Sequence, residues 1–213
     1  MLRSEIVNII NGMNSHERVV SLYNSLNPLP RGYKLQSKDP WCAATVSAVF
    51  LKAGVTSFAE CSCSVMKKKL KDLGFFRSKD YEPRIGDIIF YDWDKDDVPD
   101  HVGIIINKSG DSLLVREGNK NNRIGERIIK TYYEKIAGYG VPDYEEDRMN
   151  TIKKNDKGKL VAIWQLIVDA YPDGEFKDET EKATKIFQEN EGLEADGVVG
   201  PLSWYAGLKS VNK

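Results

Sequence analysis

The first clear helical pattern of hydrophobic residues lies at residues 19–26. Hydrophobic side chains recur there at helical spacing, at Val19, Leu22, Tyr23 and Leu26. Asn14 and Glu17 form a capping-box pattern before them, and the helix-breaking stretch NPLPRGY (27–33) follows. We therefore expect a first helix that begins after Asn14 and ends before residue 27.

Two further helices are expected in the first third of the chain. One should begin at Pro40 and end at Gly54, because proline suits the first helical turn and glycine suits the end of a helix. The other covers residues 65–76, where a hydrophobic stripe lies opposite a face rich in lysine. We interpret that lysine face as solvated.

After residue 85 the pattern changes to that of strands. Segments 86–93, 101–107 and 112–119 are short, rich in β-branched and aromatic residues, and separated by turn-forming residues. Residues 127–133 and the segment around 138–142 add two candidate strands. Helices first and strands afterwards predict an α+β domain with an antiparallel sheet.

A polar segment then divides the chain. Residues 145–158 are nearly free of hydrophobic side chains and read as a linker between a domain of residues 1–144 and a second of residues 159–213. Three short helical patterns follow, joined by the turn signals PDG (172–174) and ADG (195–197). They predict a small helical module.

Charge and composition exclude several classes of protein. The formal net charge is −1, which argues against a nucleic-acid partner or an anionic membrane surface. No hydrophobic run reaches the length of a membrane span, and the N-terminal segment lacks the features of a signal peptide. Three cysteines make no disulfide framework, so we expect synthesis in a reducing compartment. The oligomeric state is not readable from the sequence, and a monomer is the default expectation.

Cys42 lies near the start of the second expected helix. With Asp39 as the N-cap and Pro40 as the first helical residue, Cys42 is the third residue of that helix. The unpaired N–H groups and the positive end of the helix dipole favour its thiolate, the nucleophilic form. The alternative is a buried structural cysteine, which is the commoner role.

A thiol nucleophile needs a base, and the chain has two histidines. We expect His16 at the surface, without a role. His101 begins a strand, and a hairpin turn at 108–111 brings the end of the next strand opposite it. Glu117 and Asn119 lie two positions apart and so project from the same face of that strand. His101 lies on this face only if the connection between the two strands has an odd number of residues or carries a bulge. One or both then orient the ring; otherwise they are solvated.

Five motifs occur in order in the first domain: DPWCAATVSAVFLKAG, GDIIFYDW, PDHVGI, VREGN and GYGVP. Together they resemble the CHAP domains of peptidoglycan hydrolases, relatives of the NlpC-type and papain-like cysteine peptidases. The resemblance covers residues 1–144 and implies Cys42 as nucleophile and His101 as base. Glu117 and Asn119 match the family's third and fourth polar positions, and which of them orients His101 stays open.

The second domain carries motifs of its own: WQ (164–165), DGEF (173–176), FQ (187–188), GL (192–193) and DGVVGPLSW (196–204). They resemble the peptidoglycan-binding module of three short helices found on many cell-wall hydrolases. Ser203 stands where that family usually has threonine. We interpret the glycines and Trp164 as builders of turns and core rather than as ligand contacts.

The resemblance implies hydrolysis of an amide bond in peptidoglycan by a Cys-His-(Glu/Asn) thiol mechanism. The enzyme would be an N-acetylmuramoyl-L-alanine amidase or an endopeptidase of the stem or cross-bridge. We expect an endolysin synthesised in the host cytoplasm without a signal peptide and acting at the wall after release. Peptidoglycan is the expected partner, with no nucleic acid, membrane, cofactor or metal. The backbone N–H of Cys42 is one expected oxyanion donor, and Gln36 is a weak candidate for the second.

The first alternative to the hydrolase is a zinc-site protein. Its zinc site would use Cys42, Cys61, Cys63 and His101, but the CSC spacing leaves one residue between ligands and no second short pair of ligands exists in the sequence. The acidic loop 92–97 fits no EF-hand template for calcium, and we interpret it as solvated. The other alternative is a non-catalytic wall-binding protein with a degenerate hydrolase fold, against which the full set of candidate catalytic residues argues.

Overall fold

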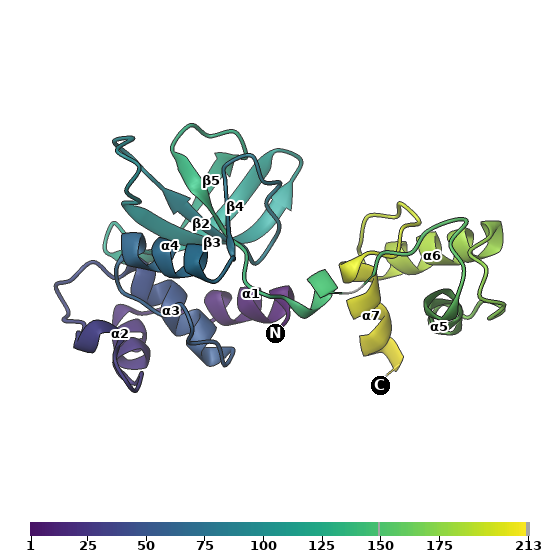
Figure 1. The fold of residues 1–213 in the computed structure, drawn as a ribbon, viewed down its shortest axis with the longest axis horizontal. Helices are drawn as coiled ribbons and strands as arrows, with labels where there is room; N and C mark the ends of the chain where they lie inside the picture. Colours follow the sequence, from purple (N-terminus) through teal and green to yellow (C-terminus); the bar gives the residue numbers. More distant parts are fainter. Residues whose placement is uncertain (149, 212–213) are drawn as a thin grey trace. The chain divides into compact units, whose positions relative to one another are not determined.

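The computed structural model describes residues 1–148 and 150–211, and the chain forms two compact units, residues 1–143 and 144–213. The first unit combines helices with a six-stranded sheet, and the second contains three helices (Figure 1). Within the described residues, no helix is both long and apolar enough to cross a bilayer.

Every neighbouring pair of strands in the sheet is antiparallel, and the strand order is β1-β6-β2-β3-β4-β5. The expected α+β architecture with an antiparallel sheet is therefore confirmed. The strand predicted at 127–133 begins earlier than expected, and β1 lies in what was predicted as the end of a helix. The strands are β1 (Phe76–Arg77), β2 (Ile88–Tyr91), β3 (His101–Ser109), β4 (Ser112–Lys120), β5 (Arg123–Lys130) and β6 (Ile136–Gly140).

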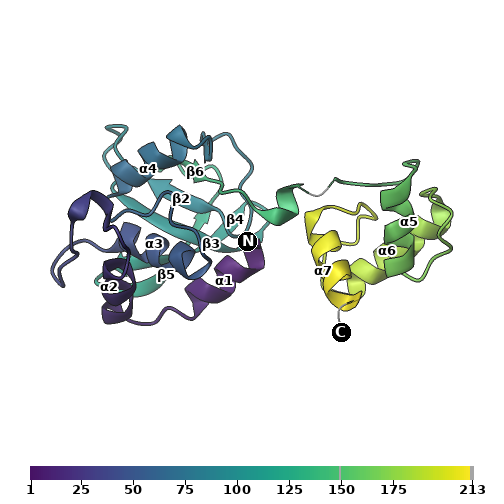
Figure 2. The same ribbon diagram turned by 60° about the horizontal axis from the view of Figure 1, so that its bottom comes forward.

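Four helices gather on one side of this sheet (Figures 1 and 2). The second of them begins one residue later than its predicted capping box implies, because Ser15 rather than Asn14 caps it and accepts a hydrogen bond from the backbone N–H of Arg18. The first helix was not expected from the sequence. The helices are α1 (Arg3–Asn11), α2 (His16–Asn24), α3 (Cys42–Lys52) and α4 (Cys63–Asp72).

Helix α3 forms the centre of the first unit. Its residues are buried from Cys42 to Phe50, and it packs against β3 and β4. Small side chains permit this close approach, and so does Gly118 on β4, where an added Cβ would lie 1.8 Å from Oγ1 of Thr45. The contact between Gly118 and Thr45 fixes the N-terminal half of α3 against the end of β4.

The hairpin between β3 and β4 decides which face carries Glu117. Its two-residue connection (110–111) would by itself place Glu117 on the face opposite His101. However, the register shifts by one residue between Ile105 and Asn107. This bulge restores the alternation, so Glu117 shares a face with His101, as the second branch of the sequence argument required.

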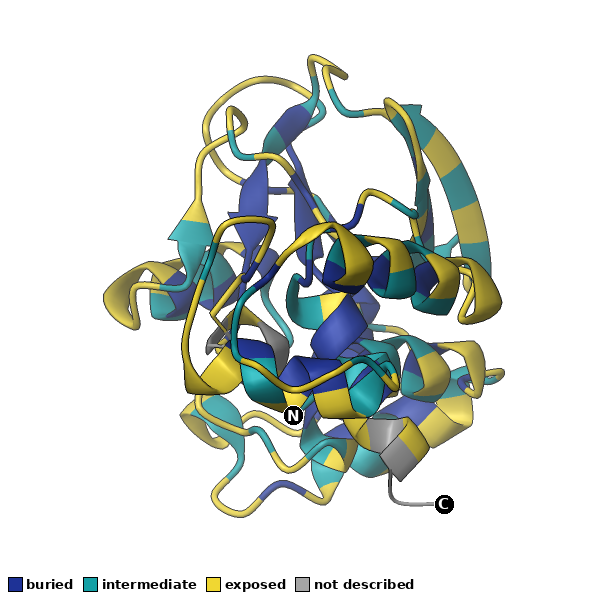
Figure 3. Cartoon of the chain, turned by 90° about the vertical axis from the view of Figure 1, so that its right-hand side faces the viewer, coloured by how far each residue is buried: buried dark blue, intermediate teal, exposed yellow. Residues whose placement is uncertain are grey.

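The face of the sheet that points away from α4 carries a separate hydrophobic cluster. An added Cβ on Gly140 would point at Leu70 of α4, so the neighbouring Tyr139 points the other way. His101 pairs with Tyr91 across β2 and β3 and lies at the edge of this cluster. Figure 3 shows buried residues in dark blue along helices and central strands. The cluster contains Ile89, Tyr91, Ile105, Leu113, Val115, Ile136, Tyr139 and Val141.

The second unit is built around two buried tryptophans. Its helices are α5 (Lys159–Ile167), α6 (Asp178–Asn190) and α7 (Pro201–Val211). Trp164 is fully buried, its Nε1–H donates to the hydroxyl of Thr184, and its ring packs edge-on against Trp204. The interpretation of Trp164 as a core residue is confirmed.

Two glutamines stabilise the two turns of this unit in the same way. Gln165 and Gln188 make the same four hydrogen bonds. The side-chain N–H groups of each donate to an aspartate 8 residues later in the chain, to a backbone carbonyl 10 residues later and to a hydroxyl 15 residues later. The side-chain oxygen of each accepts from the backbone N–H of a glycine 9 residues later. The hydroxyl belongs to Thr180 in the first case and to Ser203 in the second. Ser203 therefore keeps the hydrogen bond that threonine would make.

Part of the segment interpreted as a linker folds with the second unit. Glu145–Arg148 form a 3₁₀ turn, Ile152 is buried and pairs with Val199, and Lys157 pairs with Glu175. Ile152 is an isolated hydrophobic residue in a polar stretch, and burial of such a side chain contributes about 1.5–3 kcal/mol. The polar composition of the segment as a whole gives no sign that Ile152 is buried. Met149 of the predicted linker and residues 212–213 of the predicted second domain lie outside the described residues.

Candidate active site

Cys42 is the first residue of helix α3, with Trp41 as its N-cap. The expectation that Pro40 starts the helix and Asp39 caps it is therefore wrong. The carboxylate of Asp39 instead accepts hydrogen bonds from the backbone N–H of Gln36 and the hydroxyl of Tyr33. Cys42 nevertheless stays within the first turn, where the backbone N–H groups lack helical partners.

Three neighbours favour the thiolate of Cys42. Its sulfur lies 3.5 Å from that of Cys63, and the pKa of Cys42 falls well below the usual thiol value chiefly because the Cys63 thiol donates to it. Burial opposes this effect, since Cys42 is only 4% exposed. A hydrogen bond with His101, the charge of that ring and the backbone N–H of Ala43 add to the stabilisation.

His101 is held on both sides. Its Nε2 lies 3.2 Å from Oε2 of Glu117, which leaves Nδ1 for the sulfur of Cys42. Burial lowers the pKa of His101, but the hydrogen bonds with Cys42 and Glu117 outweigh burial and raise the pKa to about 9. At neutral pH the ring is an imidazolium beside a thiolate.

Arg127 on β5 holds Glu117 from the other side. Its Nε lies 2.8 Å from Oε1 and its Nη2 lies 3.1 Å from Oε2, a paired contact that fixes the plane of the carboxylate. Burial raises the pKa of Glu117, but the hydrogen bonds from His101 and Arg127 outweigh it and hold that pKa below its usual value. Glu117 therefore stays ionised although its side chain is fully buried.

Aromatic rings enclose this row of charges. Tyr91 and Trp93 stack with their ring centroids 4.8 Å apart, and the guanidinium of Arg127 lies over both rings. Burial and the charge of Glu117 raise the pKa of Tyr91, so its hydroxyl stays protonated. The rings limit the access of water to the ion pairs, which strengthens them.

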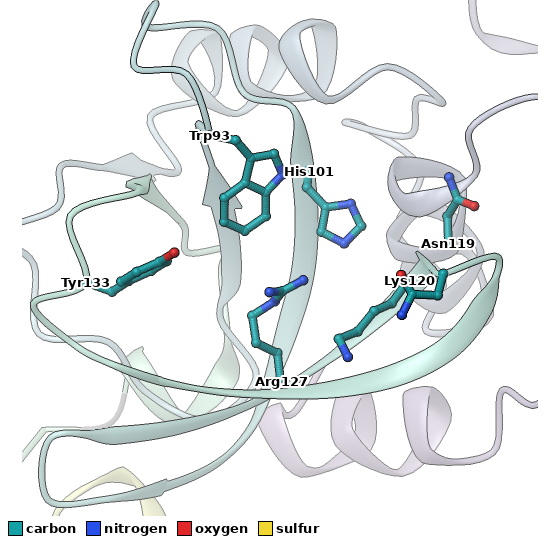
Figure 4. Close-up of a pocket in the computed structure, with 7 residues that line it drawn as sticks. Trp93, His101, Asn119, Lys120, Arg127 and Tyr133 are labelled. Carbon is teal, nitrogen blue, oxygen red and sulfur yellow. The ribbon is translucent and has the colours of Figure 1, made fainter.

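A cleft of about 470 Å³ opens beside His101 (Figure 4). Asn119 lines this cleft with a left-handed backbone (φ 56°), whereas Glu117 makes the contact with the ring. Of the two candidates left open by the sequence, the structure thus brings Glu117 against His101. The lining residues are Trp93, His101, Asn119, Lys120, Asn121, Arg127 and Tyr133.

Two other residues considered in the sequence lie apart from this chemistry. His16 was expected at the surface, but its ring packs against Trp41 with centroids 4.9 Å apart. The weak oxyanion candidate, Gln36, is exposed, and its side-chain amide donates to the carbonyl of Lys34.

The structure separates the ligands of the zinc alternative. The sulfur of Cys61 lies 3.6 Å from Oε1 of Glu60 and 3.8 Å from Nη2 of Arg31, whereas Cys63 contacts Cys42. Within the described part of the chain, three potential metal ligands converge to within 4.8 Å at Asp92, Asp94 and Asp100. The Asp92 carboxylate accepts from the loop's own backbone N–H groups, at Lys95, Asp96 and Asp97, and so closes the loop.

Sequence reasoning missed Arg127 and the contact between Cys63 and Cys42. Arg127 lies in a predicted strand, and a carboxylate and a guanidinium on neighbouring strands are a signal that a known register would have revealed. From the sequence, Cys63 has a chemical role only as a ligand of the zinc alternative. It lies 21 positions from Cys42, on a different helix, so no periodicity connects the two sulfurs.

The contact between the two sulfurs gives a first prediction. Cys63→Ala removes the donor to the Cys42 thiolate, so the pKa of Cys42 should rise. The rate of alkylation of Cys42 by iodoacetamide, measured against pH by mass spectrometry, should have its midpoint at higher pH than in the wild type. Cys61→Ala is the control and should leave the midpoint in place. An unchanged midpoint in Cys63→Ala would show that the thiol of Cys63 does not stabilise the thiolate.

Comparisons with known proteins agree with this arrangement. Residues 33–119 match the family model of the CHAP domain, and residues 166–206 match that of a peptidoglycan binding domain. The chain is also similar to a peptidoglycan-binding protein from Clostridioides difficile, solved in complex with glutamine hydroxamate. Identity is 18%, the match covers 66% of this chain and 84% of that chain, and the TM-score is 0.28. A search of curated proteins found no match.

CHAP domains are typically cysteine-dependent peptidoglycan hydrolases, and the domain therefore implies a cell-wall hydrolase of amidase or peptidase type. The peptidoglycan-binding region implies that the chain binds peptidoglycan. The chain thus carries an α+β CHAP domain followed by a three-helix region of the peptidoglycan-binding type, and it acts at the bacterial cell wall.

Proposed function

We propose that the chain hydrolyses an amide bond of peptidoglycan, with Cys42 as the nucleophile, His101 as the acid and base, and Glu117 as the group that orients His101. One observation carries the proposal. A buried cysteine at the start of α3 contacts the imidazole of His101, whose far nitrogen lies 3.2 Å from a buried carboxylate, and these contacts lower the pKa of Cys42 and raise that of His101. This is the arrangement that thiol catalysis requires.

The reaction would proceed in two stages. The thiolate of Cys42 attacks the scissile carbonyl carbon, and His101 gives its proton to the departing amine as the C–N bond breaks. The resulting acyl-thioester is then attacked by water, from which His101 takes a proton, and the carboxylic acid leaves as the thiolate reforms. The backbone N–H of Cys42 in the first turn of α3 is one donor to the oxyanion.

Glu117 would act through His101 rather than on the substrate. Its contact with Nε2 fixes which nitrogen faces Cys42, and its negative charge stabilises the imidazolium. Arg127 keeps the carboxylate ionised and oriented. Asn119 remains in the proposed site as a residue that lines the cleft beside His101 and faces the substrate.

The cleft suits a peptide that carries a carboxylate. Trp93 and Tyr133 supply apolar surface, Asn121 supplies an amide, and Lys120 places a positive charge beside the histidine. Peptidoglycan stems are short peptides with carboxylate groups near their amide bonds. The cleaved bond is either the amide between muramic acid and L-alanine or a peptide bond of the stem or cross-bridge. Mass spectrometry of fragments released from defined peptidoglycan distinguishes the two.

The proposal extends to the endolysin role expected from the sequence, with synthesis in a host cytoplasm and action at the wall after release. Cys42, Cys61 and Cys63 are free thiols, which fits synthesis in a reducing compartment. The second unit would hold the enzyme on its substrate and so raise the local concentration of scissile bonds.

Cys42→Ala should abolish hydrolysis of purified cell walls, because loss of a nucleophile that acts together with its base lowers the rate on the order of 10⁶-fold. The variant should still sediment with cell walls, since the second unit is unchanged. Turbidity and release of free amines measure the reaction. Wall lysis by Cys42→Ala would contradict the nucleophile assignment. A wild-type protein that binds walls but releases nothing would favour the non-catalytic alternative.

Glu117→Gln should lower the rate by about 10²-fold or more, because the ring of His101 loses its charged partner. In the wild type, activity should fall as the pH rises through about 9, where His101 loses its proton. Removal of the carboxylate lowers the pKa of His101, so this fall should occur at lower pH in the variant. The control is Glu126→Gln, which removes an exposed partner of Arg116. A pH profile identical to that of the wild type would exclude the role given to Glu117.

A further inference from the structure

Cys63 has no step in the proposed hydrolysis, although its sulfur contacts the nucleophile. It is the first residue of α4, where Ser62 caps the helix and accepts from the backbone N–H of Val65. The sulfurs of Cys42 and Cys63 lie 3.5 Å apart, and both residues are buried, with 4% and 8% exposure. The two helices thus place two thiols at their N-termini in van der Waals contact.

We propose that Cys42 and Cys63 form a reversible oxidative modification site. A hydroperoxide oxidises Cys42, Cys63 resolves the product as a Cys42–Cys63 disulfide, and a thiol reductant restores both. The effect on activity rests on the proposed function, because the disulfide would remove the nucleophile. The bond itself can be observed without any assay of hydrolysis.

The chemistry balances in two steps. The Cys42 thiolate attacks one oxygen of the hydroperoxide, an S–O bond forms and the O–O bond breaks. The leaving oxygen takes the proton of the His101 imidazolium and departs as alcohol or water. The sulfur of Cys63 then gives up its proton and attacks Cys42. An S–S bond forms, the S–O bond breaks, and the hydroxyl leaves with that proton as water. Two thiols lose two electrons in all, and the hydroperoxide gains them.

The geometry favours resolution over further oxidation. A disulfide requires sulfurs about 2.05 Å apart, so the two sulfurs, which lie 3.5 Å apart, must approach by about 1.5 Å. A sulfenic acid on Cys42 would therefore have a thiol in contact before a second hydroperoxide arrives. His101, which contacts Cys42, lines the cleft, so the sulfur lies one side chain away from the cleft.

The protonation of Cys63 depends on the oxidation state of Cys42. While Cys42 is a thiolate, the hydrogen bond to it, burial and its charge raise the pKa of Cys63, which stays protonated. Oxidation of Cys42 removes that negative charge and the bond that holds the proton. Cys63 becomes the better nucleophile only after Cys42 has been oxidised.

Cys61 supplies a matched control within the same segment. Its sulfur lies near the carboxylate of Glu60, and burial together with that charge raises its pKa. It is two positions from Cys63 in sequence, but its sulfur contacts Glu60 and Arg31, whereas that of Cys63 contacts Cys42. Substitution of Cys61 should therefore leave the modification intact.

The test compares the wild-type chain with Cys63→Ser and Cys61→Ser. Each protein is treated with excess hydrogen peroxide, its free thiols are blocked with N-ethylmaleimide, and it is digested without reductant. Mass spectrometry should find a linked Cys42–Cys63 peptide in the wild type and in Cys61→Ser. In Cys63→Ser, Cys42 should carry sulfinic or sulfonic acid instead. After dithiothreitol, the wild type and Cys61→Ser should recover most of their own untreated rate of wall hydrolysis, and Cys63→Ser should not.

Two outcomes would overturn the proposal. One is treated wild type in which Cys42 is sulfinic or sulfonic acid and no linked peptide occurs. The other is recovery of Cys63→Ser to the same fraction of its untreated rate as the wild type. If the untreated wild type does not hydrolyse walls but the linked peptide forms, the proposed function fails and the modification site stands. The wild-type peptide decides the matter even if Cys63→Ser does not fold.

Discussion

The first unit depends on one row of alternating charges that runs from the sulfur of Cys42 through His101 and Glu117 to Arg127. Glu117 is fully buried and the side chain of His101 is 12% exposed, and a buried charge without a partner costs several kcal/mol. The row is stable because every charge faces an opposite one at hydrogen-bond distance. The sulfur of Cys42 is thus the end of a row that extends across three strands and a helix.

The fold supplies this row through a few backbone features. Helix α3 brings Cys42 to the start of β3, where His101 lies, because its small residues and Gly118 allow the helix to lie close to the sheet. The bulge between Ile105 and Asn107 turns Glu117 to the face of His101. Without that extra residue the carboxylate would point to the helices, and the imidazole would lose its partner.

Much of this could be predicted from the sequence, because it depends on local patterns. The order of helices and strands follows from periodicity, and Cys42 and His101 stand at the ends of predicted elements. The start of α3 was misplaced, since Pro40 is compatible with both a helical and an extended backbone. Tertiary contacts were less accessible. The role of Cys63 depends on the packing of two helices, and that of Arg127 on a register which the sequence left open.

The second unit shows the same limit. Its turns and core were readable from DG dipeptides and tryptophans, and the structure adds the reason: Gln165 and Gln188 bond the backbone and side chains of both turns. The contribution of Ile152 was not readable, because a single hydrophobic residue in a polar stretch leaves no periodic signal.

The charge state of His101 tests the central claim most directly. With ¹⁵N-labelled protein, the ring nitrogens of His101 can be followed by NMR as the pH is raised. The account predicts a doubly protonated ring at neutral pH that titrates near 9, and a lower pKa in Cys42→Ala, where the thiolate is absent. A ring that is neutral at pH 7 and titrates as an ordinary histidine in both proteins would contradict it.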